Sequence, residues 1–233
     1  DLPLPIARHL ARALAHAGEP PFAVRLAHRG EFDVSPRRVA WRAFTSRQWM
    51  LGSRPGFVWA ARMSMLPAVA VDVLDAYVDG VAELRADLWG WLPLSKARAT
   101  PAIARGELMR WLAESVLVPW AWRTCPGLRW RPVDDRHADA TLADGAVDVA
   151  LHFAFGADGL AESVHADSRP RMVGGGIVET PWNGRWSDYR TCDGVLVPTR
   201  GEVEWRIDGR RKPYLRAALA RYEGVQRAGE LHA

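Results

Sequence analysis

The sequence lacks the short motifs by which common enzyme and metal-binding classes are recognised. It has no GxSxG nucleophile elbow, no HExxH pair and no dinucleotide-binding glycine fingerprint. Its two cysteines, Cys125 and Cys192, form neither a CxxC pair nor a zinc-like spacing, so we expect free thiols, with one disulfide as the less favoured alternative. We therefore expect no cofactor and no metal, and an enzyme is less favoured without being excluded.

Long apolar runs are also missing. No segment approaches the roughly 20 apolar residues that a membrane-spanning helix needs, so we expect no transmembrane segment. The chain begins at Asp1, and a leader removed before that residue would indicate export. The compartment stays open, with the cytoplasm slightly favoured.

Lysine is scarce, because only Lys96 and Lys212 occur and the formal net charge of +4 comes almost wholly from arginine. The basic residues are spread from Arg8 to Arg227 among a similar number of acids. Nucleic-acid-binding proteins instead concentrate basic residues on one face or helix. We therefore expect no nucleic-acid partner.

Tryptophan, by contrast, is abundant, with twelve in 233 residues. Tryptophan supplies large rigid apolar surfaces, which serve either a hydrophobic core or a ligand groove. The overall composition, 48% hydrophobic and 25% charged, is that of an ordinary globular protein. No linker, repeat or low-complexity segment divides the chain, so we predict one domain over residues 1–233.

Hydrophobic periodicity predicts a short helix followed by strands. Ile6, Leu10 and Leu14 repeat at helical spacing and predict a helix over residues 3–17. From there the period changes to two, which predicts a first β half over residues 22–88.

Two strands of this half have a readable face. Trp59 and Met63 share the apolar side of one strand, and Val39, Trp41 and Ala43 are assigned to one side of another. Hairpin turns are predicted where Asp-Gly pairs fall between strand patterns, at residues 79–80, 158–159, 193–194 and 208–209.

A second β half is predicted over residues 127–222, after an apolar helix over residues 105–122. The last segment is assigned to a strand through Tyr222, although its alanines favour a helix. The glycine-rich stretch around residues 173–178 lacks the ending of a phosphate loop and is interpreted as a flexible loop. The predicted fold is α+β and mainly β: a large curved antiparallel sheet, or half-barrel, of about ten strands, with the N-terminal helix and the central helix covering its concave face.

The central helix carries Arg110 and Glu114 in a segment that is otherwise apolar. The two charges lie one turn apart on a stripe much narrower than an ordinary solvent face. Either the stripe touches water and the pair contributes a few tenths of a kcal/mol, or it faces the interior, where the charges must pair with each other, with other charges or with a ligand head group. Pro119 is expected to kink or end the helix.

Two further patterns have both a functional and an ordinary interpretation. Asp135, His137 and Asp139 would share a strand face, as metal ligands or an acid/base pair would, but no other cluster completes a metal shell. Arginines mixed with tryptophans over residues 167–171 and 181–190 either stack structurally or hold an anionic head group at a pocket mouth.

The chain resembles an uncharacterised bacterial family of unknown function. The segments that carry this resemblance are LPLPIARHLARAL, PGFVWAARM, LDAYVDGVAEL, GELMRWLAESVLVPWAW, PWNGRWSDY and VLVPTRGEVEW, spread over almost the whole chain. The family has no established activity. More distantly, the order of strands, covering helix and strands is similar to the half-barrel of LolA-type lipoprotein carriers, and that resemblance implies an apolar concave face that binds acyl chains beneath a helical lid.

Our leading hypothesis from the sequence is binding of a hydrophobic or lipid-like small molecule in an apolar pocket between sheet and helix. The alternatives are an enzyme of unknown class that uses Glu114 as a buried acid/base, or a structural or interaction protein whose tryptophans fill the core. The candidate ligand-binding residues are Trp59, Met63 and Tyr77 on the sheet, and Arg110, Trp111, Glu114 and Trp120 on the helix.

Overall fold

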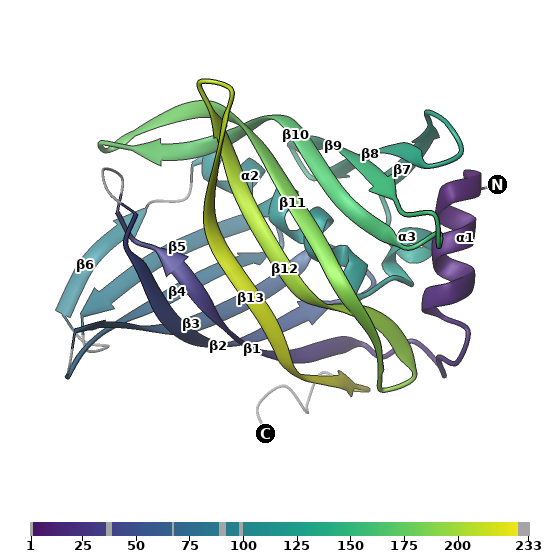
Figure 1. Ribbon diagram of the computed structural model, residues 1–233, viewed down its shortest axis with the longest axis horizontal. Coiled ribbons are helices and arrows are strands. Elements are labelled where there is room, and N and C mark those ends of the chain that lie inside the picture. The colour runs from purple at the N-terminus through teal and green to yellow at the C-terminus, as the bar shows by residue number, and fades with distance from the viewer. Residues whose placement is uncertain (1, 36–38, 67, 89–91, 98–99, 228–233) are drawn as a thin grey trace.

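The computed structural model describes residues 2–35, 39–66, 68–88, 92–97 and 100–227. These residues form a mainly β fold in which thirteen strands belong to one antiparallel sheet (Figure 1). The helical segments are α1 (Leu4–Ala13), α2 (Pro101–Glu114), the 3-10 turn η1 (Ser115–Leu117) and α3 (Ala121–Thr124). The strands are β1 (Ala23–Asp33), β2 (Trp41–Leu51), β3 (Gly56–Leu66), β4 (Val69–Val78), β5 (Val81–Leu88), β6 (Leu92–Ala97), β7 (Leu128–Pro132), β8 (His137–Asp144), β9 (Val147–Phe155), β10 (Ala161–Val173), β11 (Gly176–Cys192), β12 (Val195–Ile207) and β13 (Arg210–Val225).

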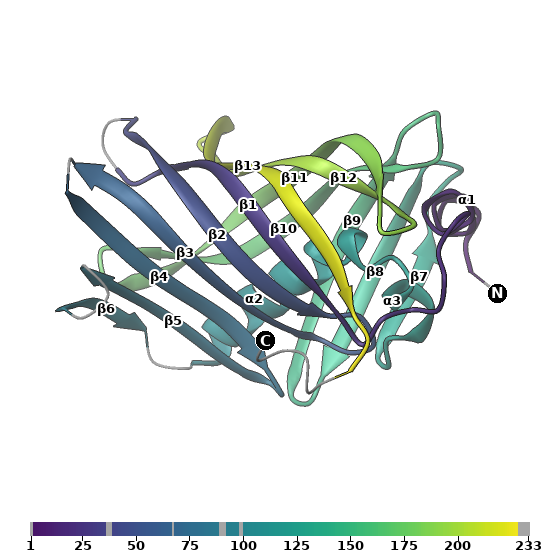
Figure 2. The same cartoon turned by 90° about the horizontal axis from the view of Figure 1, so that it is seen from below.

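The strand order joins the two β halves in an unexpected way. It runs β6-β5-β4-β3-β2-β1-β13-β12-β11-β10-β9-β8-β7, so β1 pairs with β2 on one side and with the last strand, β13, on the other. The sheet curls strongly around α2 without joining its two edges, which gives the open half-barrel seen in Figure 2. The predicted fold class is confirmed, with thirteen described strands in place of about ten.

Local sequence explains the hairpins. Asp79, Asp193 and Asp208 have positive φ angles, and each is followed by a glycine with positive φ. Two consecutive positive φ angles make the type I′ turn, whose twist matches that of paired antiparallel strands. The glycine-rich stretch is a fourth such turn: Gly174 and Gly175 both have positive φ and connect β10 directly to β11. The flexible loop predicted there was therefore wrong, because the following β-branched residues continue as a strand.

The predicted face of β2 was also wrong. Its buried residues include Phe44, Ser46 and Gln48, whereas Ala43 is exposed and Val39 is 69% exposed. A pattern based on hydrophobicity cannot identify the inward face of β2, because Ser46 and Gln48 on that face are polar. Both are nevertheless buried and hydrogen-bonded. The strand β3 alternates as predicted, with Trp59 and Met63 buried.

The central helix starts earlier and ends earlier than predicted. Thr100 caps α2 by accepting a hydrogen bond from the backbone N–H of Ile103, and Pro101 occupies its first turn. The helix stops at Glu114, before Pro119. Ser115 donates its hydroxyl to the carbonyl of Leu112 and accepts a hydrogen bond from the Trp122 indole, and such side-chain bonds compete with the helical pattern.

The position of α2 defines the interior of the molecule. It packs against β9 and β10 on one side and against β4 and β5 on the other, inside the curve of the sheet (Figure 2). Trp111, Leu108 and Leu112 of this helix are completely buried. The helix therefore bridges the two halves of the sheet, as predicted for a helix on the concave face.

Candidate functional site

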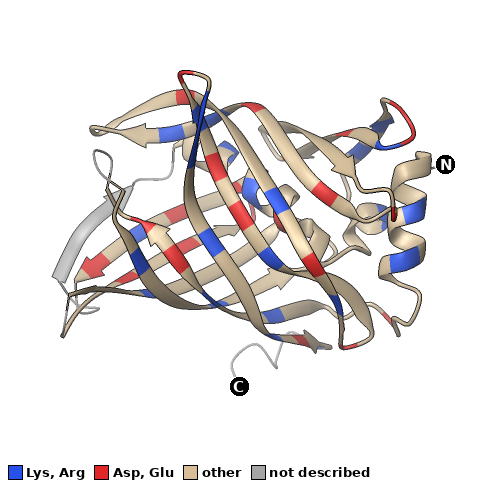
Figure 3. Ribbon diagram, in the orientation of Figure 1, with Lys and Arg blue, Asp and Glu red and all other residues tan. Residues whose placement is uncertain are grey.

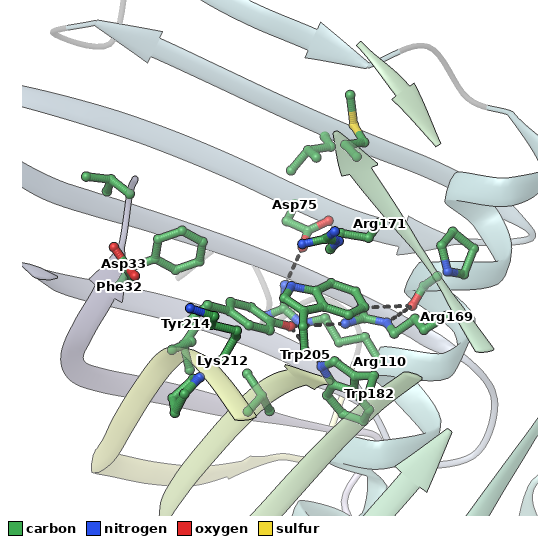
Figure 4. Close-up of a pocket in the computed structure, with 18 of the residues that line it drawn as sticks. Phe32, Asp33, Asp75, Arg110, Arg169, Arg171, Trp182, Trp205, Lys212 and Tyr214 are labelled. Atoms are coloured by element: carbon green, nitrogen blue, oxygen red, sulfur yellow. Dashed lines mark hydrogen bonds and ion pairs between the residues drawn. The ribbon is translucent and has the colours of Figure 1, made fainter. Parts of the chain in front are cut away.

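A cavity of about 920 Å³ lies between α2 and the concave face of the sheet (Figure 4). Both β halves and the helix contribute to its walls, and most of the lining is apolar. The apolar lining includes Phe32, Val34, Trp59, Met63, Val73, Leu84, Ile103, Trp182, Val203, Trp205 and Leu215. A concave apolar space with a few polar groups is the usual form of a small-molecule site.

The charged stripe of α2 faces this cavity. Gly106, Glu107, Arg110 and Glu114 all line it, at the three- and four-residue spacing that places side chains on one helical face. Of the two orientations that the sequence left open, the structure has the inward one. Glu107 belongs to the same stripe and was not singled out in the sequence.

Arg110 is the centre of a buried ionic cluster. Its guanidinium donates to Glu114 at 2.8 Å and to Asp75 on β4, and it lies over the rings of Phe57 and Trp59 at 4.8 and 4.9 Å. Burial alone would lower the pKa of Arg110, but the neighbouring carboxylates outweigh it and raise that pKa. The cation is therefore neutralised by the protein itself and held against two aromatic faces.

Glu114 lines the cavity with its carboxylate already hydrogen-bonded. One oxygen accepts from Arg110, and the other accepts from the side-chain amide of Gln48 at 2.6 Å. The side chain is 28% exposed, so it is neither sealed nor free. Both carboxylate oxygens of Glu114 are therefore already engaged by donors of the protein.

Glu107 and Asp75 form a carboxyl pair on the floor of the cavity. Burial, followed by the charge of Asp75, raises the pKa of Glu107 to about 8, and the two side chains hydrogen-bond each other. Among the described donors, neither Glu107 Oε2 nor Asp75 Oδ1 has a partner. A proton carried by Glu107 accounts for both atoms, because a protonated carboxyl can donate to a neighbouring carboxylate.

His28 lies behind this cluster on β1. Burial lowers its pKa to about 4, with the charge of Glu114 opposing and that of Arg110 assisting the shift. The Ser46 hydroxyl lies 3.5 Å from its Nδ1. His28 is thus a neutral imidazole at physiological pH and adds no charge to the cluster.

The opposite wall is built around Arg169 of β10. Its guanidinium lies over the rings of Trp182 and Trp205, donates to the hydroxyl of Tyr214 and donates to the backbone carbonyl of Gly106 on α2 (Figure 4). Of the two interpretations of the arginine and tryptophan segments, structural stacking describes Arg169. This contact also fastens the helix to the second β half.

Four of the candidate residues named from sequence line the cavity: Trp59, Met63, Arg110 and Glu114. The other three lie elsewhere in the core. Tyr77 donates its hydroxyl to Asp144, Trp111 donates its indole N–H to the carbonyl of Leu51, and Trp120 packs against Gly52. Whether the cavity-lining residues bind a ligand stays a prediction.

Sequence reasoning missed Asp75, Glu107 and Tyr214. Glu107 precedes Arg110 by three residues, so helical spacing alone could have added it to the stripe. Asp75 reaches the cluster only through the pairing of distant segments, and no local pattern marks it.

The histidines of the second β half lie on the other face of the sheet. His137 contacts Asp134, and Asp139 contacts His152 on the neighbouring strand, so the predicted alternate triple does not act as one group. Within the described residues, no group of three or more His, Cys, Asp or Glu side chains could hold a metal ion. Cys125 and Cys192 are both free thiols.

Solved structures resemble this chain at low sequence identity. A DUF1329 family protein from Desulfovibrio piger matches at a TM-score of 0.51 and 12% identity, over 96% of this chain and 94% of that one. A putative outer membrane lipoprotein-sorting protein domain from Vibrio parahaemolyticus matches at 0.50 and 8%, over 95% and 91%. A LolA superfamily protein from Nitrosomonas europaea covers 98% and 97% at 12% identity, with a TM-score of 0.44. The first two likenesses show the fold alone.

Sequence comparison identifies a family. The profile described as a family of unknown function, DUF6920, matches residues 1–223. No curated protein matches the chain. No helix in the described part of the chain is both long and apolar enough to cross a membrane.

Proposed function

The chain belongs to the family of unknown function DUF6920, and from that starting point we propose that it binds a hydrophobic or lipid-like small molecule in the cavity beneath α2. The observation that carries the proposal is the cavity itself. About 920 Å³ of space with mainly apolar walls lies between helix and sheet, whereas protein interiors are otherwise close-packed. Burying an apolar ligand there would remove both surfaces from water.

The fold gives secondary support. One structure with a similar fold is named as a putative outer membrane lipoprotein-sorting protein domain, and a lipoprotein is a protein with attached lipid. The order of strands, helix and strands suits the binding of lipid here, because the curved sheet supplies a wide apolar surface and the helix closes it.

The polar floor limits what the ligand can be. Arg110 is neutralised by Asp75 and Glu114, so it offers no free charge to an anionic head group. Deep in the cavity a ligand meets Trp59, Met63 and the carboxyl pair of Glu107 and Asp75. The apolar part of the ligand therefore lies inside, and any ionic part is best placed toward the open end.

The test is a binding assay with a defined probe. A dansyl-labelled fatty acid should quench the fluorescence of Trp59, Trp182 and Trp205 and emit by energy transfer, because these three indoles line the cavity. Native mass spectrometry of protein purified from the expressing cells, followed by solvent extraction, would identify what it carries. Protein that is reproducibly empty and gives no energy transfer would overturn the proposal.

A cavity-filling variant makes the assay specific. Val73→Trp places a large side chain on the cavity wall and should remove most of the energy transfer. Val71→Trp is the matched control, since Val71 is on the same strand and the same side, two residues away, and is not part of the lining. Both variants must keep the thermal unfolding transition of the parent before their binding is compared.

The enzyme hypothesis based on Glu114 receives less support than binding. Its carboxylate is held by Arg110 and Gln48, as an anchor would be. If proton transfer occurs in this cavity, the carboxyl pair of Glu107 and Asp75 is better suited to it, because one member is already protonated near neutral pH.

A further inference from the structure

Among the described residues, six of the ten large apolar side chains that are exposed to solvent lie at one end of the molecule. At this end lie the loops that join β1 to β2, β3 to β4, β10 to β11 and β12 to β13. We name five of these side chains the apolar rim: Val39, Met172, Val173, Ile177 and Val178. Val39 is 69% exposed and the other four are between 42% and 49% exposed. Leu66, at the end of β3, is exposed at the same end.

Four residues of the apolar rim belong to one projecting hairpin. The tip of the β10–β11 hairpin lies beyond the residues that pair with β9 and β12, and it projects at the upper left of Figure 1. Met172 pairs with Ile177 across it, and Val173 pairs with Gly176 next to the two-glycine turn. Along this tip the two strands carry apolar side chains on both faces, so no register of the hairpin could hide them all.

The rim borders the opening of the cavity. Met172, Ile177 and Val39 line the cavity as well as being exposed, and so does Lys212 at the start of β13. Since exposed residues line it, the cavity reaches the surface at this end. A surface that covered the rim would therefore also cover the cavity mouth.

Basic residues lie on the β10–β11 and β12–β13 hairpins beside the rim, together with the acid Glu179 next to Val178 (Figure 3). The β12–β13 turn carries Arg210, Arg211 and Lys212 against one acid, Asp208. Arg211 is paired with Glu202 and Glu204, but no ion pair involves Arg210 or Lys212 within the described residues. Arg171 adds a further positive charge beside Met172.

Apolar side chains that project beside unpaired cations match the surface of an anionic bilayer. Monomeric proteins seldom expose clustered apolar residues without a partner. Stable attachment to a membrane surface usually needs two signals, an inserted apolar group and attraction to anionic lipid head groups. The rim and its basic turn supply one of each.

We propose that the apolar rim docks onto an anionic lipid bilayer, with the β10–β11 hairpin tip inserted among the head groups and the cavity mouth facing the membrane. This goes beyond ligand binding in the cavity, because docking requires only the rim and its charges. If the protein carries a ligand, docking places the cavity mouth, through which the ligand enters and leaves, against the bilayer.

The experiment is flotation of the full chain with vesicles of phosphatidylcholine alone and of phosphatidylcholine mixed with phosphatidylglycerol. The parent protein should float with the mixed vesicles and much less with phosphatidylcholine, and added salt should weaken the binding because screening reduces the attraction. Val173→Glu combined with Val178→Glu should reduce partitioning about tenfold or more, since two apolar side chains can no longer insert. Neither residue lines the cavity.

The matched control uses another exposed hairpin. Val78→Glu combined with Val81→Glu makes the same change on the β4–β5 turn, at the opposite end of the sheet, and should leave flotation unchanged. Arg210→Gln should reduce the preference for mixed vesicles by a smaller factor. Circular dichroism and thermal unfolding confirm that each variant is folded.

Three results would overturn the proposal. The parent protein could fail to float with either vesicle, the rim variant could float as well as the parent, or the rim variant could abolish a concentration-dependent dimer, which would make a second copy the partner. The rim variant should still give dansyl energy transfer, and Val73→Trp should still float. Failure of docking is thereby separated from failure of ligand binding.

Discussion

The two faces of the sheet each hold a polar network, and the networks differ in almost every physical respect. On the concave face, Asp75, Glu107, Arg110 and Glu114 form a compact buried cluster with Gln48. On the outer face a chain of side-chain hydrogen bonds crosses the second β half from strand to strand. Its members, from β7 to β13, are Arg131, Asp139, His152, Asp167, His165, Asn183, Glu204 and Arg211.

The difference shows that burial determines how much stability is lost when a polar group loses its partner. In the outer chain most members are partly exposed, although Asp139 and Glu204 are buried, so water can replace the bonds of the exposed members when they break. In the inner cluster the side chains of Arg110, Asp75 and Glu114 are only 16%, 10% and 28% exposed, so removing one partner leaves a charge with little access to water. The same kind of ion pair should therefore matter much more at Arg110 than at Arg131.

The largest effect is expected from Arg110→Met. The methionine preserves packing against Phe57 and Trp59 but leaves Asp75 and Glu114 without their cation. We expect a loss of about 3–5 kcal/mol in the free energy of unfolding, measured by urea denaturation. Adding Asp75→Asn and Glu114→Gln should recover part of the loss. A loss below about 1 kcal/mol would mean that the cluster is solvated like a surface pair.

Glu107→Gln should change the pH dependence of stability. In the folded protein the pKa of Glu107 is raised to about 8, whereas the unfolded value is about 4.3. Between these values the folded state keeps a proton that the unfolded state has released, so stability falls as pH rises through the window. The glutamine side chain of the variant cannot titrate and can still donate to Asp75. The difference in melting temperature, variant minus parent, should therefore be larger at pH 8 than at pH 5.

On the outer face, Asp139→Asn tests the chain of hydrogen bonds through His152. The hydrogen bond that the His152 imidazole donates to Asp139 is the main cause that raises the pKa of His152. The stabilisation from a raised histidine pKa is complete below the unfolded value, about 6.5, and is lost as pH rises through the folded value. NMR titration of the imidazole should show a lower pKa in the variant. An unchanged pKa of His152 in the variant would show that Asp139 does not cause the shift.

The smallest effect is expected from Arg131→Ala. This side chain is 75% exposed, although it pairs with the nearly buried Asp139. We expect a change of about 0–1 kcal/mol in the free energy of unfolding by urea denaturation. Measured beside Arg110→Met, it gives the contrast between the two faces directly, and equal losses would contradict the comparison.

More of the fold than of the site could be predicted, because the sequence patterns that specify strands and turns span only a few residues. Alternation at Trp59 and Met63 and the Asp-Gly turns are written within a few residues, and they were enough for a curved antiparallel sheet. The face of β2 was misassigned because Ser46 and Gln48 are polar and buried. Their partners, His28 and Glu114, come from other elements.

The site depended on contacts that no local pattern contains. Arg110 and Glu114 were found because charges are conspicuous in an apolar helix, but their main neighbour, Asp75, lies 35 residues away from Arg110. Tyr77 and Trp120 are aromatic residues in apolar segments, as Trp59 is, but they do not line the cavity. The organisation of residues 1–233 as one domain stays a prediction.

The helix α2 is fastened at both walls of the cavity, and this has a consequence for selectivity. Arg110 ties it to β4, and Arg169 ties its Gly106 carbonyl to β10. A helix held at two sides cannot move away from the sheet to admit a larger ligand without breaking the Arg110–Asp75 ion pair or the Arg169–Gly106 hydrogen bond. The cavity beneath the helix should therefore limit the length of the ligand that it can bury. In a series of fatty acids of increasing length, the binding affinity should rise with each carbon and stop rising once the chain reaches the opening.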